Sequence, residues 1–272
     1  MKKRIAVFIP AHNEGKTIAD ILAQIPKQIF SREVLIVVAD DASTDYTANI
    51  ARRYTEHVIS MPKNVGVGAT TKAGFAYLSK FTDIQWLVKL DADGQHLPNF
   101  IESVVSKLED GADIVCCSRF HPESDKSKAP IDRILLNRAF SAQIKEITGW
   151  PISDARTGFM GFHFGDIQAI ADKLITERYG IPMELLIRLW HNKSNVCFIE
   201  IPHPARYDRG ISHRLDVKYA AEDCAAQAQR FAEGYEALLE VIFDLDITTS
   251  EVFSKRSART TSILSTEKRW RH

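Results

Sequence analysis

Two carboxylates stand two residues apart in the sequence, shortly after an apolar run of the chain. Asp91 and Asp93 follow the apolar residues 86–88, and Gln95 comes two positions later. Carboxylate and amide oxygens are hard ligands that suit Mg²⁺ or Mn²⁺, and phosphate oxygens of a substrate commonly complete the coordination shell. A solvated turn, in which aspartate only satisfies backbone donors, produces the same short pattern. A lone D-x-D motif is therefore weak evidence for a metal site, and the neighbouring segments of the chain have to decide between the metal site and the solvated turn.

Further polar side chains stand behind other apolar runs. They are Glu14, Asp40, Asp41 and Arg119. Part of this pattern has a simpler explanation, because residues 43–45 would cap a helix, and an acid in a first helical turn is favoured by the helix dipole. Capping does not require Asp40 and Asp41, however. Several carboxylates at one place are costly to bury unless a cation or hydrogen-bond donors join them, which favours a binding site.

A glycine-rich turn lies at residues 64–69, where Gly66 and Gly68 form a G-x-G sequence. Thr71 stands where the dinucleotide-binding fingerprint has its third glycine, and the chain holds no Walker A sequence. These departures disfavour a dehydrogenase. A turn into a helix and a direct phosphate contact are both open interpretations of this segment.

These polar segments need a scaffold that brings them together. Short apolar and β-branched runs predict strands at five places, which are residues 5–9, 34–38, 57–59, 86–88 and 113–116. Apolar residues at helical spacing between these runs predict intervening helices. The alternation predicts an α/β fold with a mostly parallel central sheet and helices on both faces. Ligands of such sheets bind outside the carboxyl ends of the strands, which is where the polar segments stand.

The second half of the chain has a different character. We expect a helix over residues 131–147, a loop over 153–161, two helices over 167–174 and 183–189, and a late strand over 196–201. Three parts follow from this pattern: a main domain at 1–212, a helical extension at 213–246 and a basic, poorly ordered tail at 247–272.

Composition limits the possible partners and the location. The 35 basic and 35 acidic residues give a formal net charge of +0, so no general attraction to nucleic acid is expected. The four cysteines have no regular spacing, which suits reduced thiols in the cytoplasm. No apolar run approaches the roughly 18 residues that cross a bilayer, so membrane contact is expected to be peripheral at most, at the inner membrane face.

Taken in order, these segments resemble the inverting glycosyltransferases of family 2, which adopt the GT-A fold. The ordered markers are IPAHNE at 9–14, DDASTD at 40–45, NVGVG at 64–68, DADGQH at 91–96 and SR at 118–119. Within the family, the chain is most similar to the polyprenyl-phosphate branch of the dolichol-phosphate mannose synthase type. The similarity to that branch rests on DADGQH, Arg133 ahead of Ser141, DARTGF at 154–159, Gly180 ahead of Glu184, and the R-x-x-x-G-x-S sequence at 206–212.

The resemblance also implies roles for individual residues. The donor would be bound by Pro10, Ala11, Glu14, Asp41, Asp91, Ala92 and Arg119. The metal, Mg²⁺ or Mn²⁺, would be held by Asp91, Asp93 and Gln95. Phosphates of the acceptor or donor would be contacted by Arg133, Ser141, Arg206 and Ser212. The catalytic residues would be Asp93 and Asp154.

The implied reaction moves a hexose from a UDP- or GDP-sugar to a phosphate- or hydroxyl-bearing acceptor, with a polyprenyl phosphate among the candidates. A hydroxyl acceptor needs a general base, worth about 10²–10⁴-fold in rate, and Asp154 is the candidate. A phosphate acceptor needs no deprotonation, so that Asp154 would position other groups. A turn cap is the structural alternative for this residue. Because residues after 212 do not look like a membrane anchor, a soluble sugar or a small alcohol is also an open acceptor.

Two other classes of protein share parts of this pattern. A nucleotidyltransferase that makes nucleotide sugars would show a glycine-rich phosphate loop behind the first strand, where residues 10–14 stand instead. A non-catalytic nucleotide-sugar-binding module would not need Asp41, Asp91, Asp93 and Asp154 together. A homo-oligomer is compatible with the sequence, which does not determine the oligomeric state.

Overall fold

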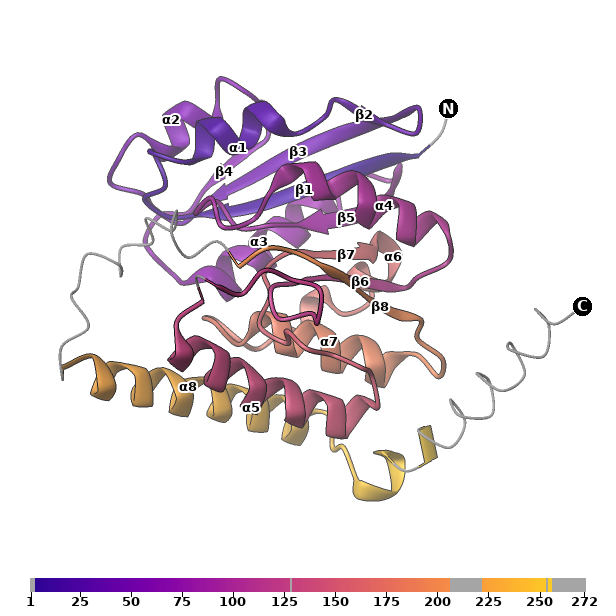
Figure 1. Cartoon of the computed structure of the whole chain (residues 1–272). Coiled ribbons are helices and arrows are strands. Elements are labelled where there is room, and N and C mark those ends of the chain that lie inside the picture. The colour runs from indigo at the N-terminus through magenta and orange to yellow at the C-terminus, as the bar shows by residue number, and fades with distance from the viewer. Residues whose placement is uncertain (1–2, 128, 206–221, 253, 256–272) are drawn as a thin grey trace, which may run out of the picture.

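The computed structural model describes residues 3–127, 129–205, 222–252 and 254–255. Its strands are β1 (Arg4–Ala11), β2 (Gln28–Ile29), β3 (Arg32–Asp40), β4 (Val58–Ser60), β5 (Ile84–Lys89), β6 (Ile114–Ser118), β7 (Met160–His163) and β8 (Phe198–Pro202). Its α-helices are α1 (Ile18–Gln24), α2 (Thr47–Ala51), α3 (Val67–Leu78), α4 (Ile101–Glu109), α5 (Ile131–Thr148), α6 (Phe164–Gln168), α7 (Ile181–Asn192) and α8 (Glu222–Asp244). Figure 1 shows their arrangement.

One sheet joins all eight strands, in the order β2-β3-β1-β5-β7-β6-β8, with β4 paired to β3. The pairs β1–β3, β1–β5, β3–β4 and β6–β8 are parallel. The strand order therefore reverses at β1, because β3 lies on one side of β1 and β5 lies on the other. This reversal of strand order is the place where sheets of this kind open a crevice for ligands.

The two faces of the sheet carry separate apolar cores. Along β1, Ile5, Val7 and Ile9 pack into the core under α1 and α4, whereas Ala6 and Phe8 pack into the core under α3, α5 and α7. A strand buried on both faces has to be apolar at every position, which explains its continuous apolar sequence. Figure 1 shows α1 and α2 on one side of the sheet and α5, α7 and α8 on the other. The predicted mostly parallel sheet with helices on both faces is confirmed.

The structure corrects the sequence-based prediction at β7. Residues 160–163 form a strand that pairs antiparallel with both β5 and β6, where a loop over 153–161 was expected to end. Gly161 weakens the local strand signal, and the fold needs it, because a Cβ there would lie 2.2 Å from Val104 Cγ1 of α4. The helix expected over 167–174 is also interrupted, since α6 ends at Gln168 and a 3₁₀ turn covers Ala171–Lys173.

The C-terminal region contributes the long helix α8. It covers most of the helical extension that was expected over 213–246. The proposed boundary at 212 lies outside the described residues, as do residues 253 and 256–272 of the tail that was expected over 247–272. Within the described part of that tail, residues 249–252 and 254–255 are helical. No helix within the described ranges combines the length and the apolar character that crossing a membrane requires.

Candidate active site

A cavity of about 790 Å³ opens at the carboxyl ends of β1, β3 and β5. One wall comes from the segments that follow these strands. The opposite wall comes from residues 175–182 and from α8, which are distant in sequence. A cavity of this size falls within the range of about 300–1,000 Å³ that is typical of small-molecule sites.

Asp91 lines the cavity, two residues after the end of β5. The buried Lys89 donates a hydrogen bond from Nζ to Asp91 Oδ1 at 2.9 Å. Burial alone would raise the pKa of Asp91, but the charge and hydrogen bond of Lys89, together with contributions from His96 and Arg119, outweigh it and lower that pKa to about 2. Gly158 leaves the room for this carboxylate, because a Cβ on Gly158 would lie 1.9 Å from Asp91 Oδ2. Asp91 is therefore an ionised carboxylate that packs closely against Gly158 and is paired with Lys89.

Asp93 and Glu14 line the same cavity, but the pKa values of their carboxyls are raised, whereas that of Asp91 is lowered. Burial, followed by the charge of Asp91, raises the pKa of Asp93 to about 6. Burial, followed by the charge of Asp93, raises the pKa of Glu14 to about 8. Burial is the larger cause of both shifts, and the neighbouring carboxylates add to it, so a bound cation would favour the ionised form of both groups.

The donor set fits a hard divalent cation that is bound in part by substrate. Within the described ranges, no group of three or more His, Cys, Asp or Glu side chains is arranged as a metal cage. Mg²⁺ and Mn²⁺ commonly use only one or two carboxylates and take their other ligands from phosphate and water. Asp91 and Asp93 line the cavity together with Gln95, and all three offer oxygen atoms. The residues present therefore suit such an ion once a diphosphate shares it.

Two buried histidines hold the turn that carries the aspartates. His96 Nδ1 accepts a hydrogen bond from the backbone N–H of Asp91 at 2.9 Å, and His203 Nε2 accepts one from Leu97 N–H at 3.1 Å. Burial lowers the pKa of His96 to about 4 and that of His203 to about 3. Both rings are thus neutral near pH 7, as acceptors of hydrogen bonds must be.

Asp41 connects the end of β3 with the glycine-rich turn. Its two carboxylate oxygens accept hydrogen bonds from the backbone N–H groups of Val65 and Gly66, at 2.8 and 2.9 Å. The first N–H groups of α3 are also occupied, because Gly68 and Ala69 donate to the carbonyl of Glu177. The glycine-rich segment is therefore a turn into a helix whose N-terminus is already capped by protein.

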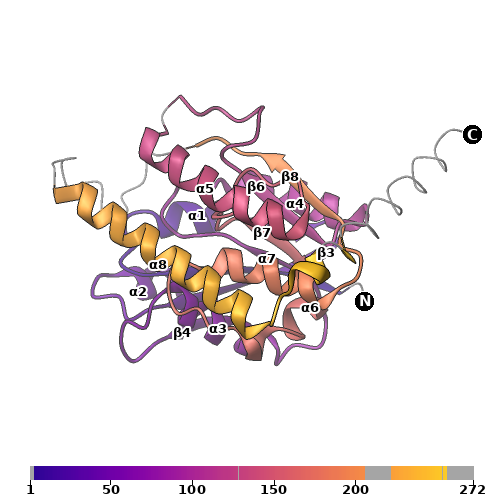
Figure 2. The same cartoon turned by 90° about the horizontal axis from the view of Figure 1, so that it is seen from below.

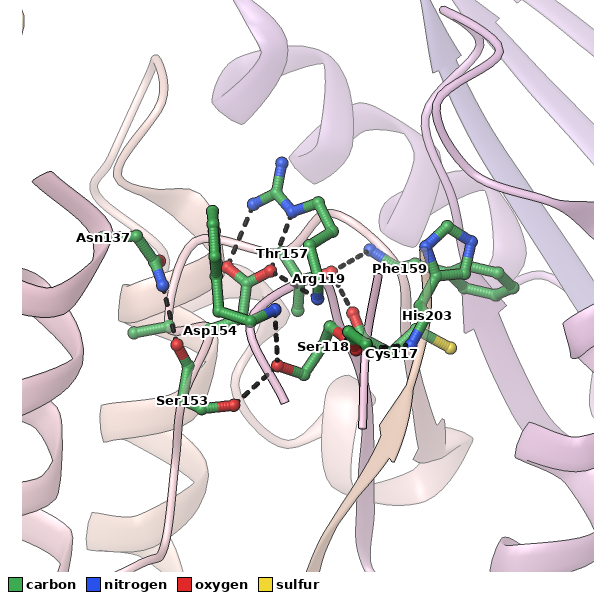
Figure 3. A network of polar contacts seen from close by, with 12 residues as sticks. Cys117, Ser118, Arg119, Asn137, Ser153, Asp154, Thr157, Phe159 and His203 are labelled. Atoms are coloured by element: carbon green, nitrogen blue, oxygen red, sulfur yellow. Dashed lines mark hydrogen bonds and ion pairs between the residues drawn. The ribbon is translucent and has the colours of Figure 1, made fainter. Parts of the chain in front are cut away.

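Arg119 and Asp154 form the centre of a polar network behind β6 (Figure 3). The Arg119 guanidinium donates two hydrogen bonds to the Asp154 carboxylate, at 2.7 and 2.9 Å. Asp154 is fully buried, whereas Arg119 reaches the cavity. Glu200 of β8 fixes the loop that carries Asp154, since it accepts hydrogen bonds from the backbone N–H groups of Ser153 and Asp154.

The structure brings most of the predicted site residues together. The cavity is lined by Pro10, Ala11, Glu14, Asp41, Asp91, Ala92, Asp93, Gln95, Arg119 and Arg133. Asp154 lies behind Arg119 instead. Ser141 is also buried, and its hydroxyl accepts a hydrogen bond from Ala155 N–H at 3.0 Å, so it supports the loop that carries Asp154. Arg206 and Ser212 fall outside the described residues.

Sequence reasoning missed two contributors to the site. Lys89 carries the counter-charge of Asp91, and the signal was a lysine directly after the apolar run 86–88, two residues ahead of the D-x-D motif. The wall formed by residues 175–182 and α8 had no such signal. Its residues join the cavity only through packing of segments that lie far apart in the chain.

Comparison with known proteins agrees with this geometry. The profile of Glycosyl transferase family 2 matches residues 6–170. The chain is similar to polyprenol monophosphomannose synthase of Mycolicibacterium smegmatis, with 26% identity over 218 residues that cover 77% of this chain and 80% of that protein. It is similar also to undecaprenyl-phosphate mannosyltransferase of Micrococcus luteus, with 28% identity over 192 residues that cover 68% of this chain and 77% of that protein.

Solved structures identify the fold. Glucosyl-3-phosphoglycerate synthase of Mycobacterium tuberculosis, in its complex with Mn²⁺ and UDP-glucose, superposes with a TM-score of 0.64 at 20% identity. The match covers 91% of this chain and 81% of that chain, and it places the present fold among the GT-A folds. A transferase is accordingly supported over the nucleotidyltransferase and over the non-catalytic binding module. The chain belongs to glycosyl transferase family 2.

Proposed function

We propose that this protein is an inverting, metal-dependent glycosyltransferase that moves a hexose from a UDP- or GDP-sugar to a phosphate-bearing acceptor. The observation that carries the proposal is that Asp91, Asp93 and Arg119 share one cavity at the carboxyl edge of the sheet. A nucleoside diphosphate needs such a pairing, because a metal ion and a guanidinium neutralise its charge from two sides.

In this proposal the nucleoside lies against Pro10, Ala11 and Asp41, where β1 and β3 end. Asp91, Asp93 and Gln95 would hold Mg²⁺ or Mn²⁺ together with the diphosphate. When bound, the metal would supply Lewis-acid stabilisation of the charge that develops on the departing nucleoside diphosphate. Glu14 lines the same end of the cavity and is retained as a proposed contact of the nucleotide-sugar donor.

The acceptor side is proposed to bind a phosphate. Arg133 lines the cavity from α5, and Arg178 lines it from the opposite wall. A phosphate oxygen attacks the anomeric carbon without prior deprotonation, so no general base is required. Asp154 then acts by fixing Arg119, which agrees with its complete burial behind that guanidinium. Arg206 and Ser212 are retained as proposed phosphate contacts.

A polyprenyl phosphate is the acceptor that we favour. Relatives of this chain are named for polyprenol and undecaprenyl phosphate acceptors. On α5, Ile131 is 68% and Leu135 is 57% exposed, close in sequence to Arg133 of the cavity. Apolar side chains beside a phosphate-binding arginine suit a lipid acceptor that is reached by peripheral contact with a membrane surface.

The proposal is tested with the purified protein and a panel of UDP-, GDP-, dTDP- and CMP-sugars, each with Mg²⁺, with Mn²⁺ and with a chelator. Calorimetry and thermal shift should report selective binding of one nucleotide class, and only when a metal is present. Asp93→Ala should abolish this response, whereas the exposed control Asp110→Ala should keep it. Binding of no nucleotide under either metal would refute the proposal.

The acceptor is tested separately. Transfer of the labelled sugar from the selected donor should occur onto polyprenyl phosphate and not onto the corresponding dephosphorylated polyprenol. Transfer onto the free alcohol instead would return Asp154 to the role of general base and would contradict the phosphate acceptor.

A further inference from the structure

A continuous series of polar contacts runs from α8 to the donor side of the cavity. It passes through residues 174–180, which connect the 3₁₀ turn to α7 and supply part of the cavity wall. We call these residues the wall segment. Residues 175–180 all line the cavity, so the position of this segment sets the shape of the space that a ligand would fill.

Glu184 of α7 fixes the start of the wall segment. Its Oε1 accepts a hydrogen bond from Ile175 N–H and its Oε2 accepts one from Thr176 N–H, both at 2.8 Å. The side chain is completely buried. Two consecutive backbone N–H groups are thereby held by the two oxygens of one carboxylate, which is a geometry that an apolar side chain cannot supply.

Arg188 of α7 extends the series to α8. Its Nε donates to Glu184 Oε1 at 2.6 Å, and its Nη2 donates to Asp244 Oδ2 at 2.7 Å. The Arg188 side chain is only 2% exposed, while Asp244 is 44% exposed on the last turn of α8. The guanidinium thus links a buried carboxylate that holds the wall segment to a half-exposed carboxylate on the C-terminal helix.

The middle of the wall segment touches α3. The carbonyl of Glu177 accepts hydrogen bonds from Gly68 N–H at 2.8 Å and from Ala69 N–H at 3.1 Å. Gly68 permits this approach, because a Cβ there would lie 2.2 Å from the carbonyl oxygen of Thr176. Asp41, which holds Gly66 of the same turn, lies on the proposed nucleoside side.

Close packing leaves α8 little freedom beside these contacts. A Cβ on Gly180 would lie 2.8 Å from Cβ of Ala237, and one on Gly234 would lie 2.8 Å from Phe140 of α5. Figure 2 shows α8 running along α5 and across α7. Movement of α8 would therefore be transmitted to the end of the wall segment through Gly180, and to its start through the contacts of Arg188.

We propose that Asp244 of α8, acting through Arg188 and Glu184, is a positioning residue that holds the wall segment in the conformation that binds the donor. The inference rests on the proposed function in that it takes the ligand of the cavity to be a nucleotide sugar. A merely structural ion pair would stabilise the fold as a whole. A positioning pair acts on the wall segment and on ligand affinity beyond any change in global stability.

Hydrogen exchange of the ligand-free protein tests the first half of the inference. In Glu184→Gln, the amides of Ile175 and Thr176 should exchange about tenfold faster relative to the amides of β1, because hydrogen bonds to a charged acceptor are lost. In Asp244→Asn, the same amides should exchange about threefold faster, since a half-exposed ion pair contributes less. Asp244→Glu should restore most of the protection.

A matched control separates this effect from general loosening of the C-terminal region. Glu251 also joins the C-terminal segment to α7, through His191 at 3.2 Å, but His191 lies one turn beyond Arg188 and outside the series of contacts that leads through Glu184 to the wall segment. Glu251→Gln should leave the amides of the wall segment unchanged. Equal exchange in Asp244→Asn and the wild type, or equal acceleration in Asp244→Asn and Glu251→Gln, would overturn the inference.

Calorimetry with UDP and with GDP, each with Mn²⁺, tests the second half. Asp244→Asn should raise the Kd of whichever nucleotide the wild type binds by about threefold, and Glu184→Gln by about tenfold, with Glu251→Gln unchanged. An unchanged Kd in both variants would overturn the inference while leaving the proposed function intact. If the wild type binds neither nucleotide, the proposed function fails, and the exchange data still decide whether Asp244 holds the wall segment.

Discussion

Three hydrogen bonds join Arg119 to Asp154. Nε and Nη2 of Arg119 donate to the Asp154 carboxylate at 2.7 and 2.9 Å, and the backbone N–H of Arg119 donates to Oδ2 at 3.0 Å. The carboxylate is fully buried, whereas the guanidinium reaches the cavity. This arrangement assigns the two residues unequal tasks, because only Arg119 can touch a ligand directly.

Asp154→Asn is expected to lower kcat/KM about 10²-fold, because Arg119 loses a charged partner and its fixed orientation. The pH dependence of kcat/KM should keep its shape, since a positioning carboxylate takes no proton from the acceptor. Asp83→Asn is the control, because it breaks the exposed Arg4–Asp83 pair and should leave the kinetics unchanged. Loss of the acidic limb of the profile in Asp154→Asn would show instead that Asp154 is the general base.

Gly158→Ala is expected to abolish metal-dependent nucleotide binding and also to lower stability, because the buried Lys89 loses its carboxylate partner. The added Cβ would lie 1.9 Å from Asp91 Oδ2, so the carboxylate would have to move away from its position beside Lys89. Calorimetry with Mn²⁺ and the selected nucleotide measures the loss, and circular dichroism checks the fold. Gly165→Ala is a suitable control, since its Cβ would meet nothing within 4 Å. Unchanged affinity in Gly158→Ala would remove Asp91 from the metal site.

Asp41→Asn should destabilise the protein by about 1–2 kcal/mol. One amide oxygen replaces two carboxylate oxygens, so that the N–H of Val65 or of Gly66 loses its acceptor. Urea unfolding followed by circular dichroism gives the free energy of unfolding. The exposed Asp20→Asn of α1 should change it by less than about 0.5 kcal/mol. Equal stability of the two variants would mean that Asp41 does not hold the glycine-rich turn.

Glu14→Gln tests the raised pKa of Glu14 through the pH dependence of stability. The pKa in the folded protein, about 8, lies above the ordinary value of 4.5, so the folded state binds the proton more tightly than the unfolded state. The contribution of Glu14 to stability is complete below about pH 4.5 and is lost as the pH rises through 8. Glutamine stays neutral throughout, so the variant should gain in Tm over the wild type between these values, by about a few degrees.

The measurement is thermal unfolding in the presence of a chelator, at intervals between pH 5 and pH 9. The exposed Glu102→Gln of α4 serves as the control and should follow the wild type at every pH. A constant difference in Tm between Glu14→Gln and the wild type would show that Glu14 does not titrate in this interval.

Local patterns in the sequence determined the scaffold and one side of the site. The continuous apolar runs of β1 and β3 reveal strands buried on both faces, because such strands tolerate no polar side chain on either side. Parallel strands end at one edge of a sheet, so the residues behind those runs were expected to meet there. The cavity lining confirms this for Glu14, Asp41 and Asp91.

Only the tertiary structure decided the contacts between residues that are far apart in the chain. It inserted β7 antiparallel between β5 and β6, placed Asp154 behind Arg119 and brought α8 to the cavity wall. It also set the pKa of Glu14, through burial and through the charge of Asp93. Periodicity and short motifs indicate which side chains of one segment are buried. They do not indicate which distant segment packs against it, because that pairing is decided only when the whole core forms.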